Sequence, residues 1–335
     1  MYATYRSLLR VAALLALTVV ILGAWVRLTD AGLGCPDWPG CYGQLTVPSL
    51  PHEHEAAAAA FPDRPLDPAK ARNEMIHRYA ASTLGLIVLT MAGLALANRR
   101  DPRQPVGLPL VLLALIIFQG LLGMWTVTLL VKPLIVVAHL LGGLSTLGLI
   151  FWLILESRHR SAVSAPRSSR RAYAPALLAL VVVVVQIALG GWTSSNYAAL
   201  ACPDLPGCLG QWWPGEADWH EAFILWRGLG VNYEGGVLDA HARVAIHFTH
   251  RLGALVTFLV VLLVGLRGMR RPSSPGMAGA GRLMLAALLL QLVLGISTVW
   301  FGLPLWVATA HNGGAALLLL SVINFNHAAS WRTRL

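Results

Sequence analysis

The stretch VAALLALTVVILGAWV occupies residues 11–26 and contains no charged side chain. A helix needs about 20 apolar residues to cross roughly 30 Å of hydrocarbon, because each residue adds about 1.5 Å. In lipid the backbone must satisfy its own hydrogen bonds, and a helix does this within one segment. With its flanking residues, the stretch therefore predicts a membrane-spanning helix at residues 8–28.

Seven further apolar runs of similar length follow. They predict spans at residues 75–97, 107–129, 134–155, 174–195, 243–266, 282–301 and 305–326. The composition agrees, since 56% of the 335 residues are hydrophobic and only 12% are charged, whereas soluble domains carry about 25% charged residues. The predicted fold class is an all-α membrane protein with eight transmembrane helices.

The charges between the runs predict the orientation of the chain. Arginines gather on one side of the predicted membrane, before residue 11 and at 99–103, 158–171, 267–282 and 332–334. Basic residues are enriched in cytoplasmic loops, so we expect both termini in the cytoplasm and a multi-pass protein of the cell inner (plasma) membrane. The first run lacks a small-residue cleavage site and is expected to be retained. The net charge of +10 lies in these clusters, so no nucleic-acid partner is expected.

An internal repeat organises the chain. Cys35-Pro-Asp-Trp-Pro-Gly-Cys41 recurs as Cys202-Pro-Asp-Leu-Pro-Gly-Cys208. Other landmarks recur at a nearly constant offset: Gly23 and Gly190, His77 and His250, Gln119 and Gln291, Gly123 and Gly295, His139 and His311. Two copies with an even number of spans are parallel, related by a pseudo-twofold axis along the membrane normal. We expect two pseudo-symmetric four-helix bundles, at residues 1–156 and 174–335, joined by a cytoplasmic linker at 157–173.

Four histidines lie inside predicted spans: His77, His139, His250 and His311. Each is in the first two turns of an even-numbered span, so all four share a similar depth in the outer leaflet, two in each half. An ionisable residue inside a span is costly and often functional. Two histidines on facing helices suit the axial positions of a heme iron. The alternative is that each histidine only hydrogen-bonds a neighbouring helix.

Six other histidines are expected to be solvated: His52, His54, His159, His220, His241 and His327. Zinc is disfavoured at the depth of the four intramembrane histidines, because no cluster of cysteines or carboxylates is expected there.

Glu74 breaks the symmetry of the repeat. It lies three residues before His77, on the same helix face, and a carboxylate beside an iron ligand could position water or accept a proton. The alternative is that Glu74 pairs with Arg72 or Arg78. The equivalent residue in the second half is His247, which suggests that one half holds a reacting heme and the other a redox cofactor. His247 also competes with His250 as a ligand. His250 is preferred because its pairing with the next arginine repeats that of His77.

The cysteines lie in two loops that the charges place outside the cytoplasm. An oxidising compartment favours the disulfides Cys35–Cys41 and Cys202–Cys208, which either clamp the loops or take part in redox chemistry. Gln119 with Gly123, and Gln291 with Gly295, are interpreted as close helix packing.

Taken as a set, several of these features resemble the heme A synthases over nearly the whole chain: Glu74-Met-Ile-His77-Arg78, the Cys35–Cys41 loop, His139, His250-Arg251 and His311-Asn312-Gly313. That family oxidises the C8 methyl of heme O to a formyl group for terminal oxidases. The resemblance implies two successive hydroxylations, first to a hydroxymethyl group and then to a geminal diol that loses water.

The resemblance also implies roles for the residues. His77 and His139 would bind the substrate heme in the N-terminal half, with Glu74 as the catalytic residue near the C8 methyl. His250 and His311 would hold the iron of a heme b cofactor in the C-terminal half. Arginines near the histidines are candidates for contacts with heme propionates: Arg27, Arg78 and Arg251. The implied partners are heme O and membrane lipid, with heme O synthase, an electron donor and a second copy of the chain as further candidates.

Two other functions use the same features differently. A bis-heme b electron carrier of a quinol-linked complex would need the four histidines but not Glu74. A transporter would usually have helices broken near the membrane midplane, whereas the prolines here fall mostly at span ends. The enzyme is therefore preferred over the carrier, and the carrier over the transporter.

Overall fold

The computed structural model describes residues 1–161, 173–270, 272, 274 and 276–330. Its helices are α1 (Tyr2–Leu28), α2 (Pro51–Ala60), α3 (Pro68–Ala97), α4 (Gly107–Thr128), α5 (Pro133–Ser161), α6 (Ala174–Ser195), α7 (Trp219–Ala222), α8 (Ala240–Arg270), α9 (Met277–Trp300) and α10 (Leu305–Ser330). All except α2 and α7 are long and apolar enough to cross a membrane. The prediction of an all-helical protein with eight spans is confirmed. Most of the predicted linker, 162–172, lies outside the described residues.

The eight long helices form two rings of four. In the first ring, α1 packs on α3, α3 on α4, α4 on α5, and α5 on α1. In the second, the matching order is α6, α8, α9 and α10. Within the described residues, no close backbone contact joins α3 to α5, or α8 to α10. The even-numbered spans of each half therefore lie diagonally across their ring, which agrees with two four-helix bundles.

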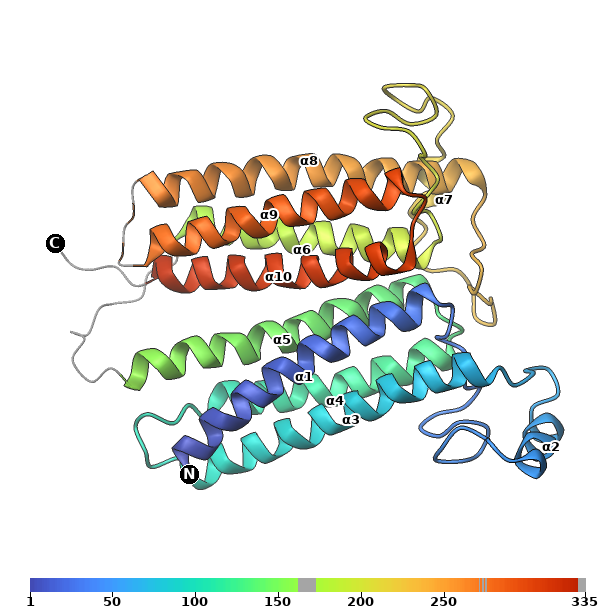
Figure 1. Cartoon of the computed structure of the whole chain (residues 1–335), viewed down its shortest axis with the longest axis horizontal. Helices are drawn as coiled ribbons and strands as arrows, with labels where there is room; N and C mark the ends of the chain where they lie inside the picture. The colour runs from blue at the N-terminus through green and yellow to red at the C-terminus, as the bar shows by residue number, and fades with distance from the viewer. Residues whose placement is uncertain (162–172, 271, 273, 275, 331–335) are drawn as a thin grey trace.

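The two rings pack side by side, as Figure 1 shows, with the first half in blue and green and the second in yellow to red. α5 contacts α10, α1 contacts α6, and the mixed pairs are α1 with α10 and α5 with α6. Under the repeat, α1 corresponds to α6 and α5 to α10. Exchanging the two halves therefore maps the α5–α10 contact and the α1–α6 contact onto themselves. It exchanges the α1–α10 contact with the α5–α6 contact. The arrangement has the contact pattern of a twofold axis running between the halves.

The long outer loop of the second half is bound to the first half. Lys132, between α4 and α5, donates from Nζ to the carbonyls of Arg227 (2.7 Å) and Gly228 (2.9 Å). Lys70 of α3 forms an ion pair with Glu234 at 3.2 Å. The loop crosses the end of the molecule opposite the start of α1 (Figure 1). It ties the two rings together on the side where the histidines lie.

Some helices are longer than predicted. α3 begins seven residues before the predicted span, at Pro68, where Asp67 caps it by accepting hydrogen bonds from the amides of Ala69 and Lys70. The segment around His52 and His54 forms the helix α2, which is not among the predicted spans. Proline at its start and the Glu53 carboxylate, which accepts from the Leu50 amide, are standard N-terminal signals.

His327 corrects another prediction. It was expected to be solvated, but α10 continues to Ser330 and packs on α5, which leaves His327 only 7% exposed. Its ring lies edge-on to Trp152 and its Nε2 is 3.9 Å from Glu156. Of the other histidines expected to be solvated, His52, His54, His220 and His241 are exposed; the side chain of His159 lies outside the described residues.

Candidate heme-binding site

The structure places the four intramembrane histidines on the diagonal helices of the two rings. His77 is on α3 and His139 on α5, while His250 is on α8 and His311 on α10. Within each half the two histidines are carried by helices that lie across the ring from each other. Nδ1 of His77, His139 and His311 is buried. This placement fits a group held between two axial ligands.

Each of these imidazoles lies against a glycine of the neighbouring helix. A β-carbon on Gly23 would come within 3.1 Å of Cε1 of His77, and one on Gly190 within 3.1 Å of Cε1 of His250. The corresponding distances are 3.5 Å from Gly123 to His139 and 3.0 Å from Gly295 to His311. Gly23, Gly190 and Gly295 thus make room for an imidazole ring, and Gly123 is in ordinary contact range of one. The sequence interpretation of Gly123 and Gly295 as helix packing missed this role.

The polar atoms of the rings are also consistent with iron ligands. Nδ1 of His77, His139 and His311 is buried and has no hydrogen-bond partner among the described residues. The carbonyl of Val19 faces His77 without completing a bond of good geometry. Buried polar atoms normally have partners, and a metal-bound imidazole normally donates its second N–H to a carbonyl or a carboxylate. Two imidazoles per half, on opposite sides of a ring of helices, are the donor set that a six-coordinate heme requires.

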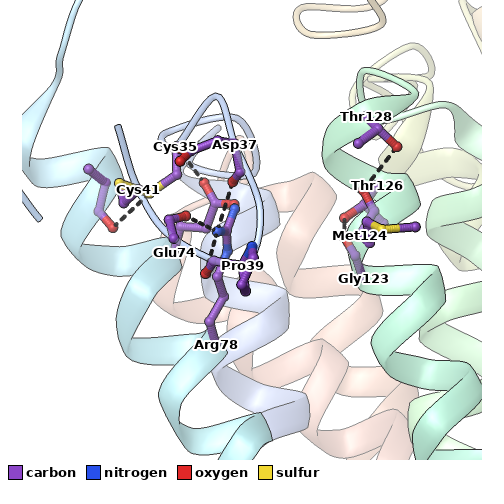
Figure 2. A network of polar contacts seen from close by, with 12 residues as sticks. Cys35, Asp37, Pro39, Cys41, Glu74, Arg78, Gly123, Met124, Thr126 and Thr128 are labelled. Carbon is purple, nitrogen blue, oxygen red and sulfur yellow. Dashed lines mark hydrogen bonds and ion pairs between the residues drawn. A yellow bond between two sulfur atoms is a disulfide. The ribbon is translucent and has the colours of Figure 1, made fainter. Parts of the chain in front are cut away.

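Glu74 lies one turn before His77 on α3 and is 4% exposed. Its Oε2 accepts a hydrogen bond from the backbone amide of Cys35 at 2.8 Å, and its Oε1 accepts from Arg78. Figure 2 shows both side chains pointing from α3 toward the Cys35–Cys41 loop. Arg78 also donates to the carbonyls of Asp37 (3.0 Å) and Gly40 (2.5 Å). The pairing of Glu74 with Arg78, raised as an alternative from the sequence, is present.

The second half repeats this arrangement with one substitution. His247 stands where Glu74 stands, is also 4% exposed, and accepts a hydrogen bond at Nδ1 from the backbone amide of Cys202 (3.2 Å). Arg251 donates to the carbonyls of Cys202 (2.5 Å), Asp204 (2.7 Å) and Gly207. His247 therefore contacts the cysteine loop, whereas His250 packs on Gly190.

Both cysteine loops are closed as predicted, by the disulfides Cys35–Cys41 and Cys202–Cys208. In each loop an aspartate accepts hydrogen bonds from two successive backbone amides. Asp37 accepts from Tyr42 (2.6 Å) and Gly43 (2.8 Å).

In the second loop, the amides of Gly210 (2.9 Å) and Leu209 (2.6 Å) donate to Asp204 and hold the pKa of its carboxyl below the usual range. The glycines at these turns, Gly43 and Gly210, have φ of 78° and 74°, which side chains disfavour. The loops are rigid caps over the histidine-bearing ends of the helices.

The three arginines considered for propionates have protein partners. Arg78 and Arg251 donate to the cysteine loops, as described above. Arg27 donates to the carbonyl of Ser194 at 2.6 Å and pairs with Asp30 at 3.1 Å. Their contacts with propionates stay predictions. Within the described part of the chain, no group of three or more His, Cys, Asp or Glu side chains is placed to hold a metal ion.

One group of residues near the histidines was not recognised from the sequence. Gln186 was not singled out, and Gln119 and Gln291 were interpreted as packing. Nε2 of Gln186 is 3.0 Å from Nδ1 of His250 and donates to the His250 carbonyl at 3.0 Å. Their spacing could have identified them, because each glutamine lies four residues before a glycine that packs on a histidine.

The chain is similar to known heme A synthases over almost its full length. The chain is 48% identical over 320 residues to a heme A synthase of Shewanella oneidensis, covering 96% of this chain and 95% of that protein. It is 29% identical to a heme A synthase of Caulobacter vibrioides over 97% of this chain and 94% of that protein. It is 31% identical to one of Bradyrhizobium diazoefficiens over 96% of this chain and 91% of that protein. Residues 6–323 match the family model described as cytochrome oxidase assembly protein. This multi-pass membrane protein therefore belongs to the COX15-CtaA family of cytochrome oxidase assembly proteins.

Proposed function

We propose that this protein is a heme A synthase, which oxidises the C8 methyl of heme O to a formyl group. The observation that carries the proposal is the asymmetry between two otherwise matching histidine sites. Both halves have diagonal imidazoles packed on glycine, but only the first has a carboxylate, Glu74, one turn from a ligand. The 48% identity to the Shewanella oneidensis heme A synthase supports the same assignment.

The two halves take different roles in this proposal. His77 and His139 hold the substrate heme within residues 1–156. His250 and His311 hold a heme b within residues 174–335, and this heme supplies electron transfer when bound. His250 rather than His247 is the ligand in this proposal, because His250 packs on Gly190 as His77 packs on Gly23, whereas His247 contacts the cysteine loop.

Glu74 is the catalytic residue of the proposed reaction. The Cys35 amide and the Arg78 guanidinium hold its two oxygens, so the carboxylate has a fixed position on the His77 face of α3. There it takes up a proton or orients water as the methyl carbon is oxidised. Two successive hydroxylations, each using one dioxygen and two electrons from the separate donor and releasing one water, convert the methyl to a hydroxymethyl group and then to a geminal diol, which loses water to give the aldehyde.

The proposed setting is the cell inner membrane, with both termini in the cytoplasm and the cysteine loops outside. Heme O reaches the site from the lipid or from a heme O synthase, and a separate donor supplies electrons. Arg27, Arg78 and Arg251 lie at the histidine-bearing ends of the helices, where heme propionates would face the outer surface. A homo-oligomer is a further candidate.

The decisive experiment is heme extraction and mass analysis from a host that makes heme O but no heme A, with and without this protein. We expect heme A only when the protein is present. In Glu74→Gln we expect unchanged heme O or an arrest at the hydroxymethyl stage, while His247→Gln, the matched change in the second half, still yields heme A. If the wild-type protein binds only heme b in both halves and leaves heme O unchanged with oxygen and an electron donor supplied, the electron-carrier function replaces the synthase.

A further inference from the structure

Three glutamines occupy equivalent positions beside three of the four histidines. Gln119 is on α4, Gln186 on α6 and Gln291 on α9, each four residues before the glycine that packs on the imidazole. Nε2 of Gln186 is 3.0 Å from Nδ1 of His250. Nε2 of Gln291 is 3.4 Å from Nε2 of His311. In the second half, both histidines therefore have a glutamine amide against the ring.

Each glutamine also packs against a second glycine, on the neighbouring helix that carries the histidine. A β-carbon on Gly253 would collide with Oε1 of Gln186, and one on Gly314 would collide with Oε1 of Gln291. These glycines lie three residues after His250 and His311, on the same helix face.

The first half has one such pair of a glutamine and a glycine. A β-carbon on Gly142, three residues after His139, would collide with Nε2 of Gln119. Gln119 is 8% exposed and its Nε2 has no partner among the described residues, as is also true of Nδ1 of His139. The unpaired amide thus lies beside the helix that carries the unpaired imidazole nitrogen.

Beside His77, both the glutamine and the glycine are replaced by other residues. Val19 of α1 stands where the other helices have glutamine, four residues before Gly23. Ala80 of α3 stands where the others have glycine, three residues after His77. The glutamine amide and the glycine that leaves space for it are therefore both absent at His77. His77 keeps its glycine contact but has no side-chain amide beside it.

We propose that Val19 and Ala80 make His77 the exchangeable axial ligand, whereas Gln186 and Gln291 contact the imidazoles of His250 and His311 and Gln119 packs against Gly142 beside His139. The inference rests on the proposed function, in which a substrate heme must enter and leave and a cofactor heme stays. Both histidines of the cofactor half thus have a glutamine beside them, and the substrate half has one glutamine, on the His139 side. Hydrogen-bonding partners orient metal-bound histidines, and their loss typically weakens metal binding about 10- to 100-fold. Gln119, Gln186 and Gln291 are accordingly positioning residues, and the His77 side of the substrate site is the side that opens.

Carbon monoxide binding to the reduced, heme-loaded full-length protein tests this without measuring turnover. Carbon monoxide binds a bis-histidine heme only after one histidine leaves, so its rate reports how firmly the ligand is held. The test variant is Val19→Gln with Ala80→Gly, which installs the missing pair at His77. The mirror variant is Gln186→Val with Gly253→Ala, which removes the pair at His250. Ala80→Gly alone controls for the helix-weakening effect of glycine.

In the wild type we expect one carbon monoxide-binding heme, lost in His77→Ala/His139→Ala. Val19→Gln/Ala80→Gly should slow its binding at least about tenfold, with the heme-to-protein ratio unchanged. The mirror variant should gain a second binding heme. An unchanged rate in the fully loaded test variant overturns the proposal. If that variant fails to accumulate, absence of new binding in a loaded mirror variant overturns it instead. The result is independent of the proposed reaction, because any iron porphyrin in the first half reports on His77, including one that is never oxidised.

Discussion

Glu74 accepts a hydrogen bond from the backbone amide of Cys35 at 2.8 Å, so the carboxylate proposed to react is fixed to the first residue of a disulfide loop. The loop, the carboxylate and the helix of His77 form one rigid unit, completed by Arg78. In the second half, the amide of Cys202 makes the same contact with His247. At this contact with the cysteine loop, the two halves therefore differ in one side chain within a shared geometry.

Glu74→Gln should remove activity while leaving the fold intact. The amide retains an oxygen that can accept from Cys35 but carries no charge, so it can neither take up a proton nor balance Arg78. We expect heme A output to fall at least about 100-fold, the lower end of the usual range for a general acid or base. Extracted hemes measure output, and the visible spectrum measures the heme retained. Full heme A production by the variant would exclude Glu74 from the reaction.

His247→Ala should retain its low-spin heme, whereas His250→Ala should lose it. His247 contacts the Cys202 amide, and His250 lies on Gly190 and beside Gln186. The heme-to-protein ratio and the electron paramagnetic resonance spectrum of the purified variants distinguish the two residues. Loss of the low-spin signal in His247→Ala alone would exchange their roles.

Gly295→Ala should weaken heme binding in the second half. Its β-carbon would come within 3.0 Å of His311, closer than nearly all real contacts, so the imidazole must shift. Gly123→Ala, at 3.5 Å from His139, should have a smaller effect. Gly279→Ala and Gly120→Ala are matched controls on the same two helices, since their β-carbons meet no atom within 4 Å. Equal heme content in Gly295→Ala and Gly279→Ala would show that the space left by Gly295 is not required for His311 to bind heme.

Replacing both cysteines of either loop by alanine should lower stability more than activity. A disulfide closing so short a loop contributes about 2 kcal/mol in the loop-entropy model. We expect a lower thermal midpoint in detergent for both Cys35→Ala/Cys41→Ala and Cys202→Ala/Cys208→Ala, with heme A output reduced less than about tenfold. A complete loss of heme A in the first variant alone, at wild-type abundance and thermal midpoint, would instead indicate redox chemistry by Cys35 and Cys41.

Asp204 should make the second cysteine loop sensitive to acid. Amides of Gly210 and Leu209 lower the pKa of this carboxyl in the folded protein. A lowered folded pKa stabilises the fold above the unfolded pKa of about 3.9, and that contribution is lost as the pH falls through the folded value. Thermal midpoints between pH 3 and 7 should therefore fall less steeply on acidification in Asp204→Asn than in the wild type. Parallel profiles would exclude this carboxyl as a contributor.

The sequence predicted those features that follow from periodicity and chemical type. Eight apolar runs gave eight long helices, and the cysteine pairs formed the expected disulfides. The equivalence of Glu74 and His247 followed from the repeat and reappears as matching contacts with the loop amides. These features are local in sequence or are fixed by comparison of one half with the other.

Features that depend on how helices face one another were not predictable in the same way. Gln186 looks like an isolated polar residue in an apolar run, and only the packing of α6 on α8 brings it to His250. His327 lies near the chain end among polar residues, which suggested solvent, until α10 was seen to continue and cover it. The contacts of Arg78 and Arg251 with the cysteine loops were likewise not predicted, because only the folded loops bring their backbone carbonyls to the guanidinium groups.

The contact between the rings has an implication for the origin of the chain. α5 meets α10, its own counterpart, and the other pairings exchange under the same twofold operation. Such an isologous surface is self-complementary. A half-length protein with four helices and this surface would have associated with a second copy of itself, each subunit carrying one pair of histidines. Joining two such genes end to end would have freed the halves to diverge, as at the position that holds Glu74 in one half and His247 in the other.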